Sequence, residues 1–310
     1  MRNVLSTAKL KASWGRVGNG NLNNSYGSLE LYAASLYGSA PTWALNQAGN
    51  PDLSWETSDQ TNIGAELGFW NNRIQTEITW FNNDVNGLIL SAPQSPSKGI
   101  PGNAILANVG SLYNRGLELS INASLIRKDH FSWNAGFNFT SVTNKVTALA
   151  AGNADIIGTT HVAANAFNIT RVGYSVGSLY GAVVDGVNPD NGRIVFVNKD
   201  GKKVQFTHVA GAGDYRWSYL DGTEAPAITA ADYQILGNAL PQWYGGFNNS
   251  FTYYNFDLGL NFTFAGGNYI MNGTRATLLD QRYFNNSVEI LERWQKPGDI
   301  THVPRLVYND

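Results

Sequence analysis

The sequence contains no cysteine, and only 14% of its residues are charged. Without cysteine, the 310-residue chain has no disulfide framework and no thiolate metal site. Its 21 Lys and Arg residues are balanced by 23 Asp and Glu residues, for a formal net charge of -2. Such a balance provides no basic surface for nucleic-acid phosphates, so we exclude nucleic acid as a partner.

Long apolar runs are absent as well. No stretch approaches the roughly 18 consecutive apolar residues of a transmembrane helix. The first ten residues, MRNVLSTAKL, lack the apolar core and cleavage site of a secretory signal. If the protein resides in a membrane, it must therefore cross it as a β-barrel. Because a barrel must first be exported, a chain without a signal is expected to be either cytosolic or incomplete.

Glycine and aromatic residues are abundant, with 33 Gly, 15 Tyr, 14 Phe and 9 Trp. This composition is typical of a β protein with many turns and aromatic anchors. Apolar and polar residues also alternate with the period of a β-strand over long stretches. The alternation predicts three hairpins, with short links at Asn71-Asn72, Arg127 to His130 and Tyr254-Asn255.

The polar positions of these hairpins carry mainly Asn, Ser, Thr, Gly and Glu, as expected of strands that line a wet lumen. Short links alternate with longer segments after Asp84, Asn144, Gly186 and Gly266. We therefore predict an all-β protein: a partial transmembrane antiparallel β-barrel with short periplasmic turns and long extracellular loops. The alternative is a soluble β-sandwich, whose apolar faces would pack against a second sheet.

Five stretches resemble the SusC/RagA-like family of TonB-dependent transporters. They include the blocks NPDLSWE and RWQKPGD and together span nearly the whole chain: Leu10–Asn19, Asn50–Ile74, Asn108–Ile121, Ile235–Phe251 and Arg293–Leu306. The resemblance implies the outer-membrane barrel of an importer of glycans or peptides, with no cofactor and no enzymatic activity. It also implies two partners, a SusD-like surface lipoprotein and, through the plug domain, the TonB complex.

Some family features are not recognisable, namely the signal peptide, the segment that contacts TonB, the plug and the final strands. We therefore expect residues 1–310 to be an incomplete C-terminal barrel portion of a longer receptor located in the cell outer membrane. Within it, we expect Glu66, Glu118, Asn122 and Asn138 to line the pore. The substrate cannot be read from the sequence.

Aromatic residues in a long loop are candidates for contacting a ligand. Tyr215, Trp217 and Tyr219 lie near charged residues between Gly186 and Leu240, a combination that can stack on sugars. Such aromatics more often pack a loop against itself or against a partner protein. Both interpretations stay open, and a soluble secreted carbohydrate-binding protein is the alternative function.

Catalytic and metal motifs are weak. Gly173–Gly177 (GYSVG) matches the nucleophile elbow of serine esterases, but the residues that follow have no helical period. An esterase at Ser175 is therefore a minor alternative, and a Gly-rich loop or strand start is favoured. The four histidines are not spaced as metal ligands, and residues 221–232 lack the alternating acidic ligands of a calcium loop. We predict no metal site, and a turn at the Gly-rich stretch Gly15–Gly20.

Overall fold

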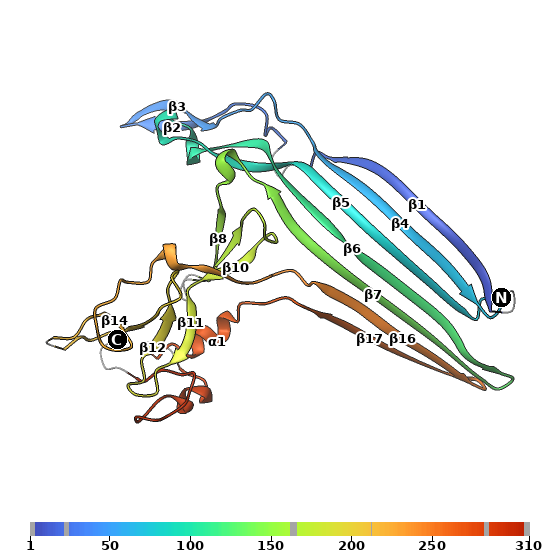
Figure 1. Ribbon diagram of the computed structural model, residues 1–310. Helices are drawn as coiled ribbons and strands as arrows, with labels where there is room; N and C mark the ends of the chain where they lie inside the picture. The colour runs from blue at the N-terminus through green and yellow to red at the C-terminus, as the bar shows by residue number, and fades with distance from the viewer. Residues whose placement is uncertain (1–3, 22–24, 162–165, 212, 282–284, 307–310) are drawn as a thin grey trace. The chain divides into compact units, whose positions relative to one another are not determined.

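The computed structural model describes residues 4–21, 25–161, 166–211, 213–281 and 285–306 (Figure 1). The chain divides into two compact units, the first made of residues 1–156, 170–176 and 240–268 and the second of the remainder. The described residues are largely β-strand and irregular structure, with one short α-helix, α1 (Gly273–Leu278). Within the described ranges, no helix is long and apolar enough to cross a membrane.

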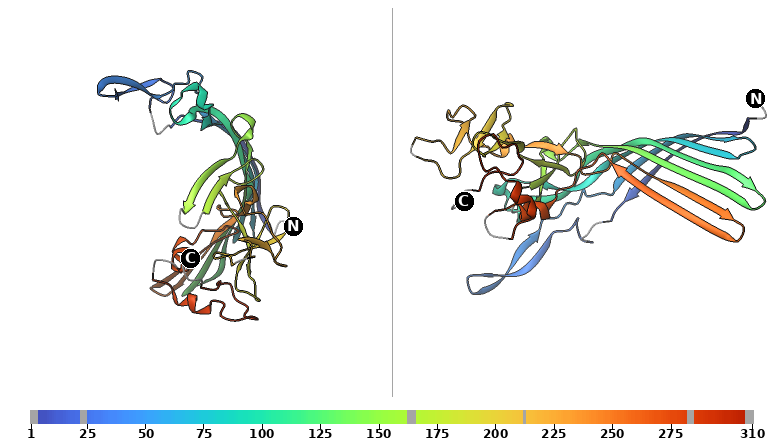
Figure 2. Two further views of the ribbon diagram at one scale, coloured as in Figure 1. Left: turned by 90° about the vertical axis from the view of Figure 1, so that its left-hand side faces the viewer. Right: turned by 90° about the horizontal axis from the view of Figure 1, so that it is seen from below.

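The first unit contains a seven-stranded antiparallel sheet in the order β1-β4-β5-β6-β7-β16-β17. Its strands run side by side as one long twisted sheet (Figures 1 and 2). Their bounds are β1 Leu5–Asn19, β4 Glu56–Phe69, β5 Ile74–Pro93, β6 Ala104–Lys128, β7 Phe131–Ala148, β16 Trp243–Tyr253 and β17 Phe256–Gly266. The all-β antiparallel fold and the three predicted hairpins are confirmed.

The three hairpins have short links that lie together at one end of the sheet (Figure 1). In the first link, Asn71 and Asn72 have φ values of 57° and 59°. Asparagine tolerates this left-handed conformation better than most residues, which explains the tight turn. The other two links are neighbours, and the rings of His130 and Tyr254 stack with their centroids 4.5 Å apart.

Two expectations about turns are wrong. The Gly-rich stretch after Gly15 continues β1 as far as Asn19, which pairs with Glu56 on β4. The partner strand supplies the hydrogen bonds, and the missing Cβ of Gly18 leaves room for the ring of Trp55, which lies 3.3 Å from the position a Cβ would take. The long loop expected after Asp84 is also mostly strand, because β5 continues to Pro93. Only residues 94–103, with the 3-10 turns η1 (Pro96–Lys98) and η2 (Pro101–Asn103), connect it to β6.

The NPDLSWE block is fastened to the extended parts of β5 and β6 by side-chain amides. The Asn108 amide donates to the carbonyls of Ser54 and Gly87, both at 2.8 Å, and its oxygen accepts from the Ser54 backbone N–H at 2.8 Å. The Asn50 amide donates to the Leu106 carbonyl at 2.8 Å. These hydrogen bonds hold the block in place where the chain enters β4.

A separate two-stranded hairpin, β2 (Leu31–Tyr37) and β3 (Ala40–Gln47), precedes this block. One of its faces is apolar, because Tyr32, Ala34 and Leu36 pair with Leu45, Trp43 and Pro41. The hairpin was not predicted from the sequence.

The second unit is built around two small antiparallel sheets. One has the order β15-β10-β9-β8, with bounds Gln234–Gly237, Ser178–Gly181, Ala166–Thr170 and Ile156–His161. The other has the order β11-β12-β13-β14, with bounds Val183–Val187, Ile194–Val197, Lys203–Phe206 and Trp217–Tyr219. Three short 3-10 turns complete the described elements: η3 Ala151–Asn153, which belongs to the first unit, η4 Ala230–Asp232 and η5 Val288–Glu292.

The RWQKPGD block packs on the turn between β11 and β12. The indole of Trp294 donates to the Pro189 carbonyl at 2.8 Å, and the Gly298 N–H donates to the same carbonyl at 2.9 Å. A Cβ on Gly192 would lie 2.5 Å from the Trp294 ring, so only glycine fits beneath it. The second block of family resemblance is thus a packing motif within this unit.

Candidate functional site

Residues that lie opposite one another in neighbouring strands point to the same face of a sheet. This pairing gives the seven-stranded sheet one apolar face. One row across five strands is entirely apolar: Leu10, Ala65, Ile78, Leu119 and Phe139. The next row towards the short links is apolar except at Thr76, and it ends in the paired residues Phe137, Phe247 and Phe262. The register therefore combines the alternation of single strands into one continuous surface.

The opposite face is polar and carries all four residues predicted to line a pore. Glu66 and Asn138 belong to one register row, Glu118 lies opposite Thr79 and Thr140, and Asn122 lies opposite Gln75 and Gly136. The sheet thus brings these side chains onto one wall without gathering them into a compact site. Whether they line a pore stays a prediction.

A charge cluster lies on the polar face near the first strand. Glu66 and Glu77 are directly opposite in the ladder, where two like charges repel each other. The Lys11 ammonium lies 2.9 Å from a carboxylate oxygen of each and so bridges them. All three side chains are roughly 40% exposed, so the two ion pairs contribute little to stability.

Beyond Trp14, charged side chains replace the apolar ones on this face. Two residues further along β1, the Arg16 guanidinium donates to both carboxylate oxygens of Asp59, at 2.6 and 2.7 Å. On β6, the Arg115 guanidinium lies 3.8 Å from the ring centre of Tyr113. An apolar band bounded by aromatic and then charged side chains is typical of a strand that leaves a membrane.

The aromatic residues expected in a loop lie partly on a strand. Trp217 and Tyr219 belong to β14, and only Tyr215 precedes it. The ring centre of Trp217 lies 4.9 Å from that of Phe206 and 5.6 Å from that of Phe196. Trp217 therefore packs within its own small sheet, as the self-packing interpretation requires, and a ligand or partner role for the three residues stays a prediction.

Ser175 occupies a structural turn. Its hydroxyl donates to the Asn144 amide oxygen at 3.0 Å, and the Val176 N–H donates to the same oxygen at 2.9 Å. The turn is a loop, as favoured from the sequence, and the described element that follows it is the strand β10, whereas an esterase elbow leads into a helix. Asp185 and His208, which follow Ser175 in the chain order of an esterase triad, belong to the second unit.

Two of the three acidic residues of the stretch 221–232, Asp221 and Asp232, stabilise turns. Asp232 accepts backbone N–H groups from Thr229 at 2.9 Å and Lys199 at 3.2 Å, and these bonds hold the pKa of its carboxyl below the usual range. Asp221 accepts from the N–H and the hydroxyl of Thr223, which lowers its pKa as well. Among the described residues, no group of three His, Cys, Asp or Glu side chains could hold a metal.

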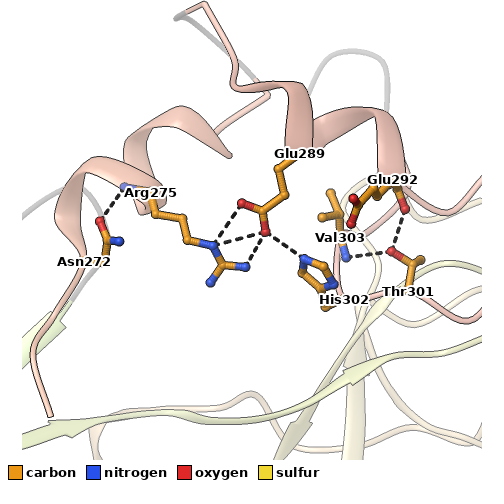
Figure 3. Close-up of polar contacts among 7 residues, drawn as sticks. All are labelled: Asn272, Arg275, Glu289, Glu292, Thr301, His302 and Val303. Atoms are coloured by element: carbon orange, nitrogen blue, oxygen red, sulfur yellow. Dashed lines mark hydrogen bonds and ion pairs between the residues drawn. The ribbon is translucent and has the colours of Figure 1, made fainter.

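A carboxylate cluster in the second unit was not predicted (Figure 3). Glu289 on η5 is contacted by the Arg275 guanidinium of α1 and, at 2.7 Å, by Nε2 of His302. Arg275 first, and then His302, lower the pKa of Glu289 to about 2. The three residues are far apart in sequence, so no local spacing could have indicated the cluster. The cluster connects α1, η5 and the segment that contains His302, and we assign it a structural role.

Comparison with known proteins gives consistent matches. The family model "TonB dependent receptor-like, beta-barrel" matches residues 3–298. TonB-dependent receptor P3 of Formosa agariphila is 28% identical over 310 residues, which cover 98% of this chain and 30% of the relative. TonB-dependent receptor SusC of Bacteroides thetaiotaomicron is 32% identical over 216 residues, which cover 64% of this chain and 21% of SusC. The chain thus spans less than a third of the length of these relatives.

Solved structures support the same fold. The "RagAB peptide transporter" matches with a TM-score of 0.79 and 24% identity, over 98% of this chain and 32% of the solved one. The RagAB peptide importer in its "open-open" state also matches with a TM-score of 0.79 and 24% identity, over 99% of this chain and 31% of the solved one. With the family match over nearly its whole length, this chain belongs to the TonB-dependent receptor β-barrel family and is similar to SusC and RagAB-type transporters.

Proposed function

We propose that this chain forms part of the wall of an outer-membrane importer, with its apolar face towards lipid and its polar face towards a lumen. The observation that carries this proposal is the register of the seven-stranded sheet, which keeps apolar and polar residues on opposite faces from β1 to β17. A wall between lipid and water needs this division at every strand.

The apolar band has the height that a membrane requires. On β7 the alternate residues from Phe131 to Phe139 are apolar, and tilted strands of roughly nine to eleven residues cross the hydrocarbon core. On the two outer strands Leu10 is 87% exposed and Phe256 is 78% exposed. A soluble sandwich would bury such side chains against a second sheet, whereas lipid covers them in a barrel.

The polar face supports the assignment of Glu66, Glu118, Asn122 and Asn138 to the lumen. In this arrangement the short links face the periplasm and the long segments face the outside. Transport through such a wall needs no catalytic residue, and the proposed role is therefore passage and not catalysis.

The relatives support a substrate class and a set of partners. The RagAB structures are described as those of a peptide transporter, and SusC is a TonB-dependent receptor. We propose import of glycans or peptides, capture shared with a SusD-like surface lipoprotein, and energy supplied by the TonB complex through a plug domain. The proposal concerns the whole receptor of which this chain represents a part.

Single introduced cysteines test which face meets lipid, because the chain contributes no cysteine of its own. Leu119 and Ser120 are neighbours on opposite faces of β6. In outer membranes that contain the receptor, Ser120→Cys should react with a charged, water-soluble maleimide. Leu119→Cys should react only with an apolar maleimide that partitions into lipid. Equal reaction of both thiols with the charged reagent would contradict the membrane proposal.

A further inference from the structure

Two cationic side chains lie just beyond the apolar band, on the face of the sheet that we assign to lipid. Arg115 of β6 continues the alternation of Leu117 and Leu119, and Lys145 of β7 continues that of Phe139. No register shift interrupts either strand between these positions, so both cations are on the same face as the apolar residues. We call Arg115 and Lys145 the cation pair.

The cation pair is compact enough to hold one anion. In the ladder, Arg115 is opposite Thr143 and Lys145 is opposite Tyr113, so the two cations are diagonal neighbours. The Cα atoms of such neighbours lie about 7–8 Å apart, within the reach of two long side chains. Both side chains are exposed. One oxyanion between them can therefore contact both charges.

The Arg115 guanidinium is held by an aromatic ring and not by a carboxylate. Its central carbon lies 3.8 Å from the centre of the Tyr113 ring. Stacking uses the flat side of the guanidinium and leaves the N–H groups at its edge free to donate, in a planar fork that matches phosphate. Within the described ranges, neither Arg115 nor Lys145 forms an ion pair.

The acidic side chains at this level of the same face have other partners. Both carboxylate oxygens of Asp59 accept from Arg16, at 2.6 and 2.7 Å. Asp84 accepts from the Asn82 amide at 2.6 Å, and it lies on β5, which β6 separates from Lys145. The charge of the cation pair is therefore available to an anion from outside the chain.

The cation pair lies at the level expected of lipid headgroups. The last row of the apolar band contains Trp80 on β5 and Trp243 on β16, and tryptophan is enriched where the hydrocarbon core meets the headgroups. Arg115 is one row beyond it and Lys145 two rows, or about 7 and 13 Å along the strands. Strand tilt makes the corresponding heights above the hydrocarbon smaller.

We propose that the cation pair binds the phosphate of an outer-leaflet lipid whose acyl chains lie along the apolar band. Lipid fits better than free phosphate because the cations continue the apolar surface, so one molecule can cover both. This face points away from the lumen, and a plug inside the barrel does not cover it. The inference rests on the proposed wall, with its short links towards the periplasm, and adds a lipid site to it.

Thiol protection tests binding at the pair. The receptor that carries this chain is purified in neutral detergent with Thr143→Cys, which is opposite Arg115 and two residues from Lys145. A water-soluble maleimide labels the thiol, and mass spectrometry identifies the labelled position. The probe is lipid A, a phosphorylated glucosamine lipid, and it should slow the labelling several-fold. Dephosphorylated lipid A with the same acyl chains, or inorganic phosphate alone, should leave labelling nearly unchanged.

Two controls assign the protection to the pair. Thr61→Cys lies in the same register row on β4 and should be labelled equally in the two lipids. Combined with Thr143→Cys, Arg115→Gln and Lys145→Gln should each raise the lipid A concentration needed for protection several-fold, and together they should abolish protection. Lys9→Gln removes one positive charge from the opposite face, where Lys9 pairs with Glu66 in the ladder, and should leave protection unchanged.

The outcomes separate the lipid site from the proposed wall. Equal protection by the two lipids would overturn the phosphate site and leave the wall standing. Protection by inorganic phosphate alone would overturn the assignment to lipid. Phosphate-dependent protection that survives the loss of both cations would overturn the assignment to Arg115 and Lys145. Reaction of Leu119→Cys with the charged maleimide in outer membranes would overturn the membrane proposal, and the lipid site with it.

Discussion

The indole Nε1 of Trp133 donates a 3.0 Å hydrogen bond to the Oδ1 of Asn249 on the neighbouring strand β16. Both residues lie on the apolar face, where Asn249 is opposite Ala135 and Leu260. An unpaired amide on a face covered by lipid costs several kcal/mol, because no water is present to accept or donate. The indole satisfies the oxygen of this amide.

Removing the indole donor should destabilise the barrel wall. Trp133→Phe keeps an aromatic ring but leaves the Asn249 oxygen without its partner, at an expected cost of about 1–3 kcal/mol in the free energy of unfolding. Urea unfolding of the receptor in lipid vesicles measures this cost. The double variant Trp133→Phe with Asn249→Leu should recover most of the loss, because no polar group is then left unpaired. A double variant as unstable as the single one would show that the hydrogen bond is not the cause.

A charge on the apolar face should cost more than one on the polar face. Leu119→Arg places a guanidinium in the middle of the apolar band, where about 2–4 kcal/mol is expected for an arginine at the bilayer midplane. Ser120→Arg adds the same charge one residue away on the opposite face and should cost little. The amount of folded receptor in the outer membrane, measured by heat-modifiable gel mobility, should fall for Leu119→Arg only. Similar losses for both would argue against lipid on this face.

The hydrogen bonds of the Asn108 side chain should keep the NPDLSWE block ordered. Asn108→Ala removes the hydrogen bonds to Ser54 and Gly87 and should destabilise the local fold by about 1–3 kcal/mol. The expected result is faster proteolytic cleavage within residues 50–55, while the hairpins at the other end of the sheet stay resistant. Asn114→Ala, which removes a different side-chain amide of β6, is the matched control. Equal cleavage in the two variants would show that Asn108 does not hold this block.

Much of the sheet could be predicted from the sequence because strand alternation is local. The residues between Thr61 and Phe81 show both faces of two strands, and the structure places Glu66 and Glu118 on the polar face as the alternation predicts. The continuation of β1 past Gly15 could not be predicted, because its hydrogen bonds come from β4, far along the chain.

Other parts depend on contacts that leave no periodic signal. Strands as short as Trp217–Tyr219 contain too few residues to show alternation, so the small sheets of the second unit were expected to be loop. Asn122 and Asn248 share one register row, on either side of Gly136, only because β16 pairs with β7 across a long connection. The sequence predicts that Asn122 faces the lumen, but it does not predict which residue of β16 lies in the same row.

The Glu289 cluster should give the second unit a defined dependence on pH. The pKa of Glu289 falls from 4.5 to about 2 on folding, because Arg275 and His302 donate to its carboxylate (Figure 3). A lowered pKa means that the stabilisation is fully present above pH 4.5 and is lost as the pH falls through about 2. Glu289→Gln should therefore loosen residues 285–306 at neutral pH, and the difference from wild type should vanish near pH 2.

Backbone hydrogen exchange of residues 285–306, compared between variant and wild type at matched pH, measures this effect. Glu292→Gln makes the same change of charge at the end of η5, and it should leave exchange close to that of wild type because only the backbone carbonyl of Glu292 holds Thr301. If the two variants exchange alike, the charge of η5 matters and the contacts of Glu289 do not. If only Glu289→Gln loosens the segment, and only above the pH at which its carboxyl titrates, the ion pair with Arg275 and the contact with His302 hold these three segments together.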